Sequence, residues 1–270
     1  GTKHTAPRRR VAVGEHLRSP LRKWAFALSR LVFKLWFALV FAFSLVLLYL
    51  PFRVLLRKPK GYPAAFRLMR AWARFLGFAG LMPLRVEWTG VLPPAPYVVC
   101  FNHSSYLDIV HAFNVLPEYF VFLGKHELLY WPLFNIFFQD MHIAVNRANG
   151  AEAARALMRA GRALDQGISV GLFPEGTISA EAPRMLPFKD GAFRLAVKKQ
   201  VPIVPITFVN NWLLFGDPEQ PWSRGRPGVA RAVVHPAVPT QGLGASDVDT
   251  LRQRVFDAIE GPLRKAYPEP

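Results

Sequence analysis

The stretch that decides the fold is residues 97–108, which read YVVCFNHSSYLD. Its first five residues form an uninterrupted apolar run that is typical of a buried strand, and polar residues follow at once. The pattern then predicts a helix near residues 106–115. His103 therefore stands at the carboxyl end of a strand, which is the edge where open α/β sheets place their binding sites.

The same alternation of strand and helix continues along the chain from residue 84. The predicted strands are residues 84–88, 97–101, 119–123, 142–145, 169–173, 203–209 and 230–235. The predicted helices lie near residues 106–115, 131–139, 150–166, 190–199 and 247–266. Alternating strands and helices indicate an α/β domain, here residues 83–270, with a mixed central sheet flanked by helices.

The first 82 residues have a different composition, and they divide into a polar arm and a set of helices. Residues 1–20 are basic and contain two prolines, so we expect a flexible arm there. Residues 21–82 are predicted to be membrane-associated helices. Within them, residues 35–52 carry no charge and would form a helix of about 27 Å, close to the ~30 Å of a bilayer core.

The sequence leaves open whether residues 35–52 cross the bilayer, lie in its surface or form a buried core helix. If they cross it, the flanking Lys34 and Arg53 would complete the span by reaching to the head groups. Residues 24–34 would then lengthen the helix or lie in the interface. Residues 61–82 predict a second, amphipathic helix whose basic side suits a membrane surface.

The charge of the chain favours an anionic membrane as partner. Lys and Arg outnumber Asp and Glu by 34 to 18, which gives a formal net charge of +16. The basic residues cluster in the first 75 positions, around the most apolar segment, as in proteins that contact anionic lipid. We expect no nucleic-acid partner, because no base-stacking motif accompanies the charge.

Cysteine and histidine usage bears on the chemistry. Cys100 is the single cysteine, so no intrachain disulfide can form, and its place in an apolar run predicts a packing role. The histidines at positions 103, 111, 126 and 142 lack the short paired spacing of metal ligands. We therefore expect neither a metal site nor a cofactor.

His103 and Asp108 form the candidate catalytic pair. They would meet only if His103 precedes the helix and Asp108 lies in its first turn. The carboxylate would then fix the imidazole tautomer and leave the second ring nitrogen free as a base, with a substrate hydroxyl in place of the serine of a hydrolase triad. The competing interpretation is a plain helix start, because Ser105-x-x-Asp108 is also a capping box.

A second strand, residues 169–173, ends in the tight loop Pro174-Glu175-Gly176-Thr177. Such a loop exposes backbone N–H groups and a hydroxyl, and it can hold a phosphate or glycerol hydroxyls. An ordinary strand-to-loop turn would give the same pattern.

Four motifs in order resemble the glycerolipid acyltransferase family, in particular the 1-acylglycerol-3-phosphate acyltransferases. The resemblance covers roughly residues 85–215. The motifs are Asn102-His103-x4-Asp108, residues 124–128 leading to Val145-Asn146-Arg147, Phe173-Pro174-Glu175-Gly176-Thr177, and residues 201–205.

The resemblance implies specific roles for residues at these positions. His103 would be the general base, and Asp108 would orient it. Lys125 and Arg147 would bind the acceptor phosphate. The residues expected to line the acceptor pocket or to add a further basic group to it are Glu175, Gly176, Thr177 and Lys189.

The implied activity is transfer of an acyl group from acyl-CoA or acyl carrier protein to the sn-2 hydroxyl of 1-acylglycerol-3-phosphate, giving phosphatidic acid at the cytoplasmic face of a membrane. Two departures bear on the acceptor: Ile178 stands where many relatives have arginine, and a glycine common before the Arg147 strand is absent. The alternatives are acylation of another lysolipid, such as a lyso-aminolipid, and a non-enzymatic basic membrane-binding protein.

Overall fold

The fold is built on a seven-stranded sheet. The computed structural model describes residues 20–268, except 131–132, 140, 147–148 and 217–222. The strand order is β1-β7-β6-β2-β5-β3-β4. The strands are β1 (Leu84–Trp88), β2 (Val98–Phe101), β3 (Phe120–Lys125), β4 (Ile143–Val145), β5 (Ser169–Leu172), β6 (Ile203–Phe208) and β7 (Ala230–Val234). Neighbouring strands pair parallel except β6 with β7, so the predicted mixed α/β sheet is confirmed.

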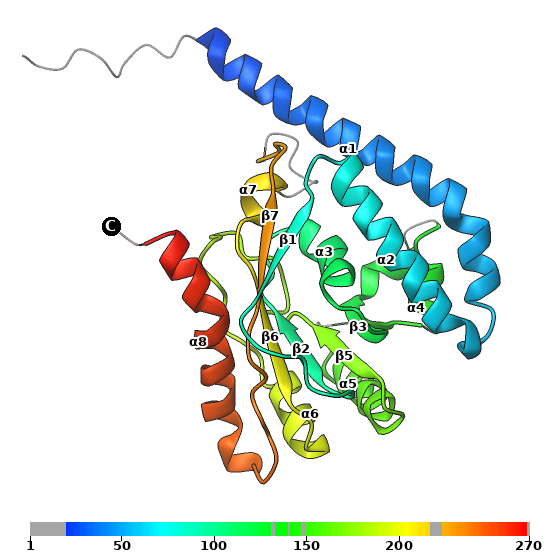
Figure 1. The fold of residues 1–270 in the computed structure, drawn as a ribbon, viewed down its shortest axis with the longest axis vertical. Helices are drawn as coiled ribbons and strands as arrows, with labels where there is room; N and C mark the ends of the chain where they lie inside the picture. The colour runs from blue at the N-terminus through cyan, green and yellow to red at the C-terminus, as the bar shows by residue number, and fades with distance from the viewer. Residues whose placement is uncertain (1–19, 131–132, 140, 147–148, 217–222, 269–270) are drawn as a thin grey trace, which may run out of the picture.

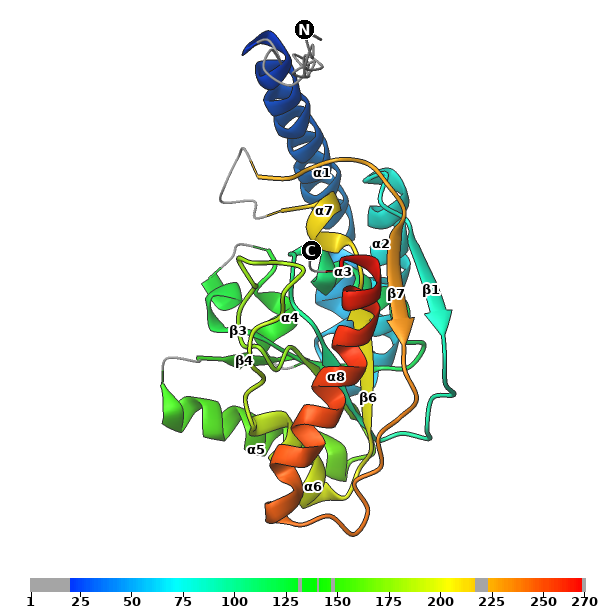
Figure 2. The ribbon, with the colours of Figure 1, turned by 90° about the vertical axis from the view of Figure 1, so that its left-hand side faces the viewer.

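Helices cover both faces of the sheet (Figures 1 and 2). They are α1 (Pro20–Leu55), α2 (Tyr62–Ala79), α3 (Leu107–Val115), α4 (Ile136–Gln139), α5 (Gly150–Asp165), α6 (Gly191–Lys199), α7 (Asn211–Leu214) and α8 (Val248–Ala266). Short 3-10 helices occupy Pro59–Gly61, His126–Tyr130 and Ala245–Asp247. Helices α5, α6 and α8 pack on one face of the sheet, and α2, α3 and α4 pack on the other.

The central strand β2 shows why the apolar run at its start is uninterrupted. Val98 and Cys100 point into the core under α5, α6 and α8, whereas Val99 and Phe101 point into the core under α2, α3 and α4. All four are fully buried. A strand covered on both faces needs apolar side chains at every position. Burial also raises the pKa of the Cys100 thiol, as expected for a packing residue.

Two helix predictions differ from the structure. The helix predicted for residues 131–139 is wrong in extent, because α4 begins only at Ile136. Leu133 has a φ of 66°, a left-handed backbone that no α-helix can contain. The amphipathic helix predicted to reach residue 82 ends at Ala79 for the same reason, since Leu81 has a φ of 58°.

Helix α1 is longer than the apolar segment that predicted it. It runs unbroken from Pro20 to Leu55, so the segment at residues 24–34 continues the same helix. The helix is long and apolar enough to cross a membrane by length and composition, and 28% of its most apolar window is buried against the protein. The arm predicted for residues 1–20 lies almost entirely outside the described residues.

Helix α1 is fastened to the body along one side. Phe33 and Phe37 pack in a small cluster with Met82 and Phe215, and Trp36 Nε1 donates a hydrogen bond of 2.8 Å to Ala79 O. Lys34 is 7% exposed and donates to Ser223 Oγ, so the expectation that it reaches to lipid head groups is wrong. Its ammonium is held by the loop before β7 instead.

Candidate active site

His103 and Asp108 meet at the carboxyl edge of β2. His103 follows the strand directly, and Asp108 lies in the first turn of α3. His103 Nδ1 is 3.1 Å from Asp108 Oδ2, so the geometry that the spacing required is present. His103 is 7% exposed and Asp108 is fully buried.

Asp108 also organises the start of the helix. Its Oδ2 accepts the backbone N–H groups of Ser104 at 2.6 Å and Ser105 at 2.7 Å, while Leu107 N donates to Ser105 Oγ at 3.0 Å. Asp108 therefore holds the helix start, as one interpretation expected, and it also contacts His103, while the catalytic role of the pair stays a prediction. One carboxylate holds the turn and the imidazole together, and these hydrogen bonds compensate the cost of burying it.

The imidazole of His103 is held in one plane. Its ring stacks on Phe173 with 3.9 Å between centroids and 6° between planes. Among the described residues, none forms a hydrogen bond with Nε2. A neutral ring with its Nδ1 proton directed to Asp108 therefore presents the Nε2 lone pair to whatever occupies the site, which is the arrangement a general base requires.

Glu175 supports the backbone of His103. Its Oε1 accepts His103 N at 2.7 Å, and its Oε2 accepts Leu186 N at 2.7 Å. The side chain is 3% exposed, and burial, together with the charge of Asp108, raises its pKa to about 7. Both carboxylate oxygens thus contact protein backbone, and Glu175 fixes the loop after β2 to the loop after β5.

Asn102 joins two strands of the sheet beside the His103–Asp108 pair. Its Nδ2 donates to Phe208 O at 3.0 Å, and its Oδ1 accepts Phe208 N at 2.7 Å. This double contact joins the ends of β2 and β6, where the backbone pairing of the two strands stops. The backbone on which His103 lies is thereby fixed twice, by the Asn102 side chain and by the hydrogen bond from His103 N to Glu175.

The loop after β5 brings together three residues that the sequence singled out. Gly176 has a φ of 81°, and an added Cβ would lie 2.8 Å from Lys189 Nζ. The Lys189 side chain thus passes over Gly176, and both line a small, mainly apolar cavity of about 170 Å³ between β5, α5 and α6. Thr177 is exposed beside them.

The remaining predicted phosphate ligands lie toward the β3–β4 side. Lys125 is the last residue of β3 and is exposed at the carboxyl edge of the sheet, opposite Val145 of β4. Arg147 lies outside the described residues. Ile178 is half-buried where many relatives have arginine. In the described part of the chain, no three His, Cys, Asp or Glu side chains gather as metal ligands.

Three contributors to this site were not predicted as site residues. Asn211 donates from Nδ2 to Asp108 Oδ1 at 2.8 Å, and His111 lies behind it. Phe173 was noted only as part of a motif. Asn211 follows β6 at the same edge of the sheet as His103, so the position of strand ends would have indicated it.

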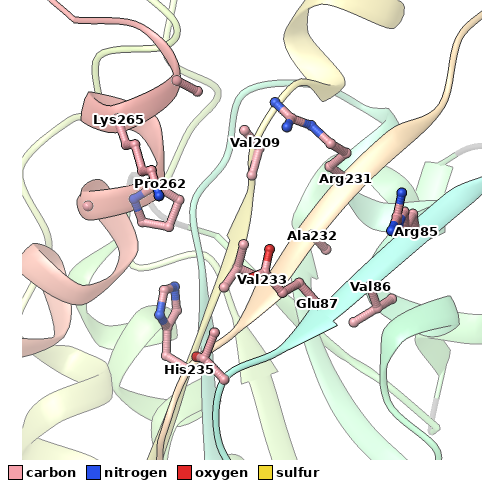
Figure 3. Close-up of a pocket in the computed structure, with 13 residues that line it drawn as sticks. Arg85, Val86, Glu87, Val209, Arg231, Ala232, Val233, His235, Pro262 and Lys265 are labelled. Carbon is pink, nitrogen blue, oxygen red and sulfur yellow. The ribbon is translucent and has the colours of Figure 1, made fainter.

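A separate basic groove lies between the strands β1 and β7 and the C-terminal part of α8 (Figure 3). It has a volume of about 780 Å³ and is bounded by β1, β7 and α8. Arg85, Arg231 and Lys265 supply its positive charges, with Glu87 and His235 among them. None of the described sequence-predicted site residues lines this groove, so the His103–Asp108 pair is not part of it.

Comparison with known proteins identifies the domain around the pair. The acyltransferase family model matches residues 84–209. The 1-acyl-sn-glycerol-3-phosphate acyltransferase alpha of Ovis aries is 38% identical over 186 residues, covering 65% of this chain and 61% of that protein. The Homo sapiens beta protein of the same name is 35% identical over 158 residues, covering 58% of this chain and 55% of that protein.

A solved structure shares the fold. The crystal structure of the 1-acyl-sn-glycerophosphate (LPA) acyltransferase, PlsC, from Thermotoga maritima superposes with a TM-score of 0.74 at 22% identity, covering 90% of this chain and 98% of that one. This chain spans about three-fifths of the length of the first curated relatives it matches. Its residues 84–209, the segment that the acyltransferase family model matches, hold the His103–Asp108 pair.

Proposed function

We propose that this protein transfers a fatty acyl group from an acyl thioester to the sn-2 hydroxyl of 1-acylglycerol-3-phosphate, giving phosphatidic acid. The observation that carries the proposal is the buried His103–Asp108 pair, with 3.1 Å between Nδ1 and Oδ2, in an acyltransferase-family domain. The acceptor is proposed from the similar proteins, which are 1-acyl-sn-glycerol-3-phosphate acyltransferases.

In the proposed reaction His103 Nε2 takes the proton of the acceptor hydroxyl. The hydroxyl oxygen attacks the thioester carbonyl carbon, and Asp108 stabilises the imidazolium that forms. The carbon–sulfur bond then breaks, and the leaving thiolate takes the proton from His103. A new ester and a free thiol result, and no group of the protein is acylated on the way.

The acceptor phosphate would be bound by basic side chains at the same edge of the sheet. Lys189 lies against Gly176 in the loop that also contains Glu175, and Lys125 ends the strand β3. Together with Arg147 they would pair with the phosphate, while Thr177 would face the glycerol. Glu175 contributes by accepting a hydrogen bond from His103 N, which is bonded directly to the α-carbon of the base.

The proposed membrane contact is the outer apolar face, which we define as the large exposed hydrophobic side chains of α1 and the end of α2. These are Trp24, Phe26, Leu28, Val32, Leu35, Trp36, Leu39, Phe43, Val46, Leu47, Leu50, Val54, Phe75, Phe78 and Leu81. An apolar surface of this size in water calls for a partner.

We propose that the outer apolar face lies in the plane of the bilayer rather than crossing it. Packing of α1 against the body from Phe33 to Phe52 covers about 28 Å of helix, so a crossing helix would carry the body into the lipid. The catalytic helix α3 starts beside the same cluster, since Leu107 packs with Phe37. The acyl chains of donor and acceptor would thus both reach the site from one leaflet, which we propose to be the cytoplasmic one.

The test is an acyl-transfer assay with purified protein in vesicles. The acceptors are 1-acylglycerol-3-phosphate and a phosphate-free lyso-aminolipid, each with acyl-CoA and with acyl carrier protein as donor. We expect product from 1-acylglycerol-3-phosphate, its loss in His103→Ala, and its retention in the matched variant His235→Ala. Preference for the lyso-aminolipid, an acceptor that Ile178 leaves open, would contradict the proposed acceptor. Full turnover by His103→Ala would refute the catalytic role of His103.

Membrane binding is tested separately by co-sedimentation with anionic vesicles. Replacing Leu39 and Phe43, which are 68% and 69% exposed, by aspartate should release the protein from vesicles without unfolding it. Binding equal to that of the unchanged protein would show that the outer apolar face is not the contact. The His103→Ala protein should bind vesicles normally while it loses acyl transfer. A non-enzymatic membrane-binding protein would show no transfer before or after the substitution.

A further inference from the structure

Behind the catalytic pair lies a second row of buried polar groups. Asn211 Nδ2 is 2.8 Å from Asp108 Oδ1, Asn211 Oδ1 is 3.2 Å from His111 Nδ1, and His111 Nε2 is 3.2 Å from Met82 O. All four residues are fully buried. The row continues the contact between His103 and Asp108 inward, away from the substrate side.

The chemistry of the groups fixes the direction of each hydrogen bond. A carboxylate only accepts, so the Asn211 amide must turn its NH₂ to Asp108 and its oxygen to His111. The amide oxygen can only accept a hydrogen bond, so His111 Nδ1 must carry the proton that it donates to that oxygen. Donors therefore converge on Asp108 from both sides, from His103 and from the His111–Asn211 row.

The tautomer of His111 follows from the same row. Burial lowers the pKa of His111 to about 4, although Asn211, Asp108 and the Met82 carbonyl act in the other direction. At neutral pH the ring thus carries one N–H and faces two acceptor oxygens. The amide oxygen of Asn211 is fixed by Asp108, so placing the proton on Nδ1 completes the row to the catalytic carboxylate.

Three separate segments meet in this row. Asp108 and His111 are three residues apart on α3 and share one side of it. Asn211 is the first residue of α7, directly after β6, and Met82 lies in the connection between α2 and β1. With its proton on Nδ1, His111 only packs against the Met82 carbonyl, so the orientation of the carboxylate is set by α3 and by the segment after β6.

We infer that Asn211 and His111 are positioning residues for the catalytic pair: Asn211 sets the plane of the Asp108 carboxylate, and His111 sets the amide of Asn211. The inference rests on the proposed function. Neither residue reaches the substrate side, so both act through Asp108 on the orientation of His103.

The first test is Asn211→Asp, which keeps the shape of the side chain and replaces the donor by an acceptor. We expect kcat at pH 7.5 to fall about 10- to 100-fold, the range for losing a hydrogen bond to a charged group. KM for the lysophospholipid should stay within about twofold.

The pH dependence of the same variant separates positioning from a general loss of structure. In acid the new carboxyl group is protonated and can again donate to Asp108, so the ratio of unchanged-protein to variant kcat should fall as the pH falls. Titratable groups facing Asp108 are His103 and His111, from its own segment, and Glu175, from the loop after β5. They are common to both proteins, and the ratio removes their direct contribution. A ratio that is constant from pH 5.5 to 8.5 would overturn the inference.

The neighbouring asparagine provides a matched control. Among the described residues, the Asn210 side chain bonds only with backbone groups, donating to Val229 O at 2.9 Å and accepting from Arg231 N at 2.8 Å. Asn210→Asp makes the same chemical change one residue away from the row. It should keep kcat within about threefold, and a loss equal to that of Asn211→Asp would contradict the assignment.

His111 offers a second test that does not depend on Asn211→Asp folding. His111→Gln keeps an N–H donor and should retain most of kcat, whereas His111→Phe fills the space without a donor and should lose it. Equal kcat in the two variants would overturn the inference. An unchanged protein without activity on any lysolipid would instead refute the proposed function, so the two failures are distinguishable.

Discussion

Glu175→Gln is the substitution for which the structure gives the most definite change in the pH dependence of the free energy of unfolding. Glu175 is 3% exposed, and burial raises its pKa from 4.5 to about 7. The unfolded chain loses this proton near pH 4.5, whereas the folded protein holds it until pH 7. The contribution of Glu175 to the free energy of unfolding is therefore fully present below pH 4.5. It falls by about 3 kcal/mol as the pH rises to 7.

The glutamine variant has no proton to lose there. Its amide also places a donor opposite one of the two N–H groups that Glu175 accepts, from His103 or Leu186, but this penalty does not depend on pH. The difference in Tm between the two proteins should thus change by about 6–12 °C between pH 4.5 and 8, with the variant gaining on the unchanged protein as the pH rises.

Thermal unfolding in detergent, followed by circular dichroism at half-unit pH steps, measures this difference. The control is Glu181→Gln, because Glu181 lies on the same loop with its side chain 73% exposed beside Arg184. It should leave the pH dependence of Tm unchanged. A difference between Glu175→Gln and the unchanged protein that stays constant across the range would refute the reasoning, since it would mean that Glu175 titrates normally in the fold.

Three further substitutions test the loop and the core. Gly176→Ala should destabilise the fold by about 1–2 kcal/mol in urea unfolding, because φ at this position is 81°, and unchanged stability would contradict the left-handed backbone. Lys189→Ala should raise KM for 1-acylglycerol-3-phosphate about fivefold while leaving KM for a phosphate-free lysolipid unchanged; an equal change for both would remove Lys189 from the phosphate site. Cys100→Ala should cost about 1 kcal/mol in stability and keep kcat, and loss of activity in a folded variant would contradict a packing role.

The sheet could be predicted from the sequence because its strands are buried on both faces. Each predicted strand matches an observed one to within two residues at either end, as in β2, where burial on both sides leaves no polar position. Contact between His103 and Asp108 was predictable for a local reason, since one turn of chain joins the strand end to the helix.

What the sequence could not show depends on backbone conformation or on distant contacts. The left-handed Leu133 shortened α4, and leucine itself gives no sign of a left-handed backbone. Burial of Lys34 depends on Ser223, 189 residues away. Asn211 reaches Asp108 across 103 residues, and a spacing argument on one segment cannot find such a partner. The predicted roles of all the site residues stay predictions: His103, Asp108, Lys125, Arg147, Glu175, Gly176, Thr177 and Lys189.

The strand order also has a consequence for how this chain is made. Synthesis proceeds from the N-terminus, so α1 and α2 are complete before β2 has either neighbour, and β1 must wait for β7, whose residues lie 146 positions later. Contacts this far apart make folding slow. During that interval the apolar side of α1 that later packs on the body is uncovered as well. We expect these apolar sides to need a temporary partner before the core exists, and under the proposed function a lipid surface would be that partner.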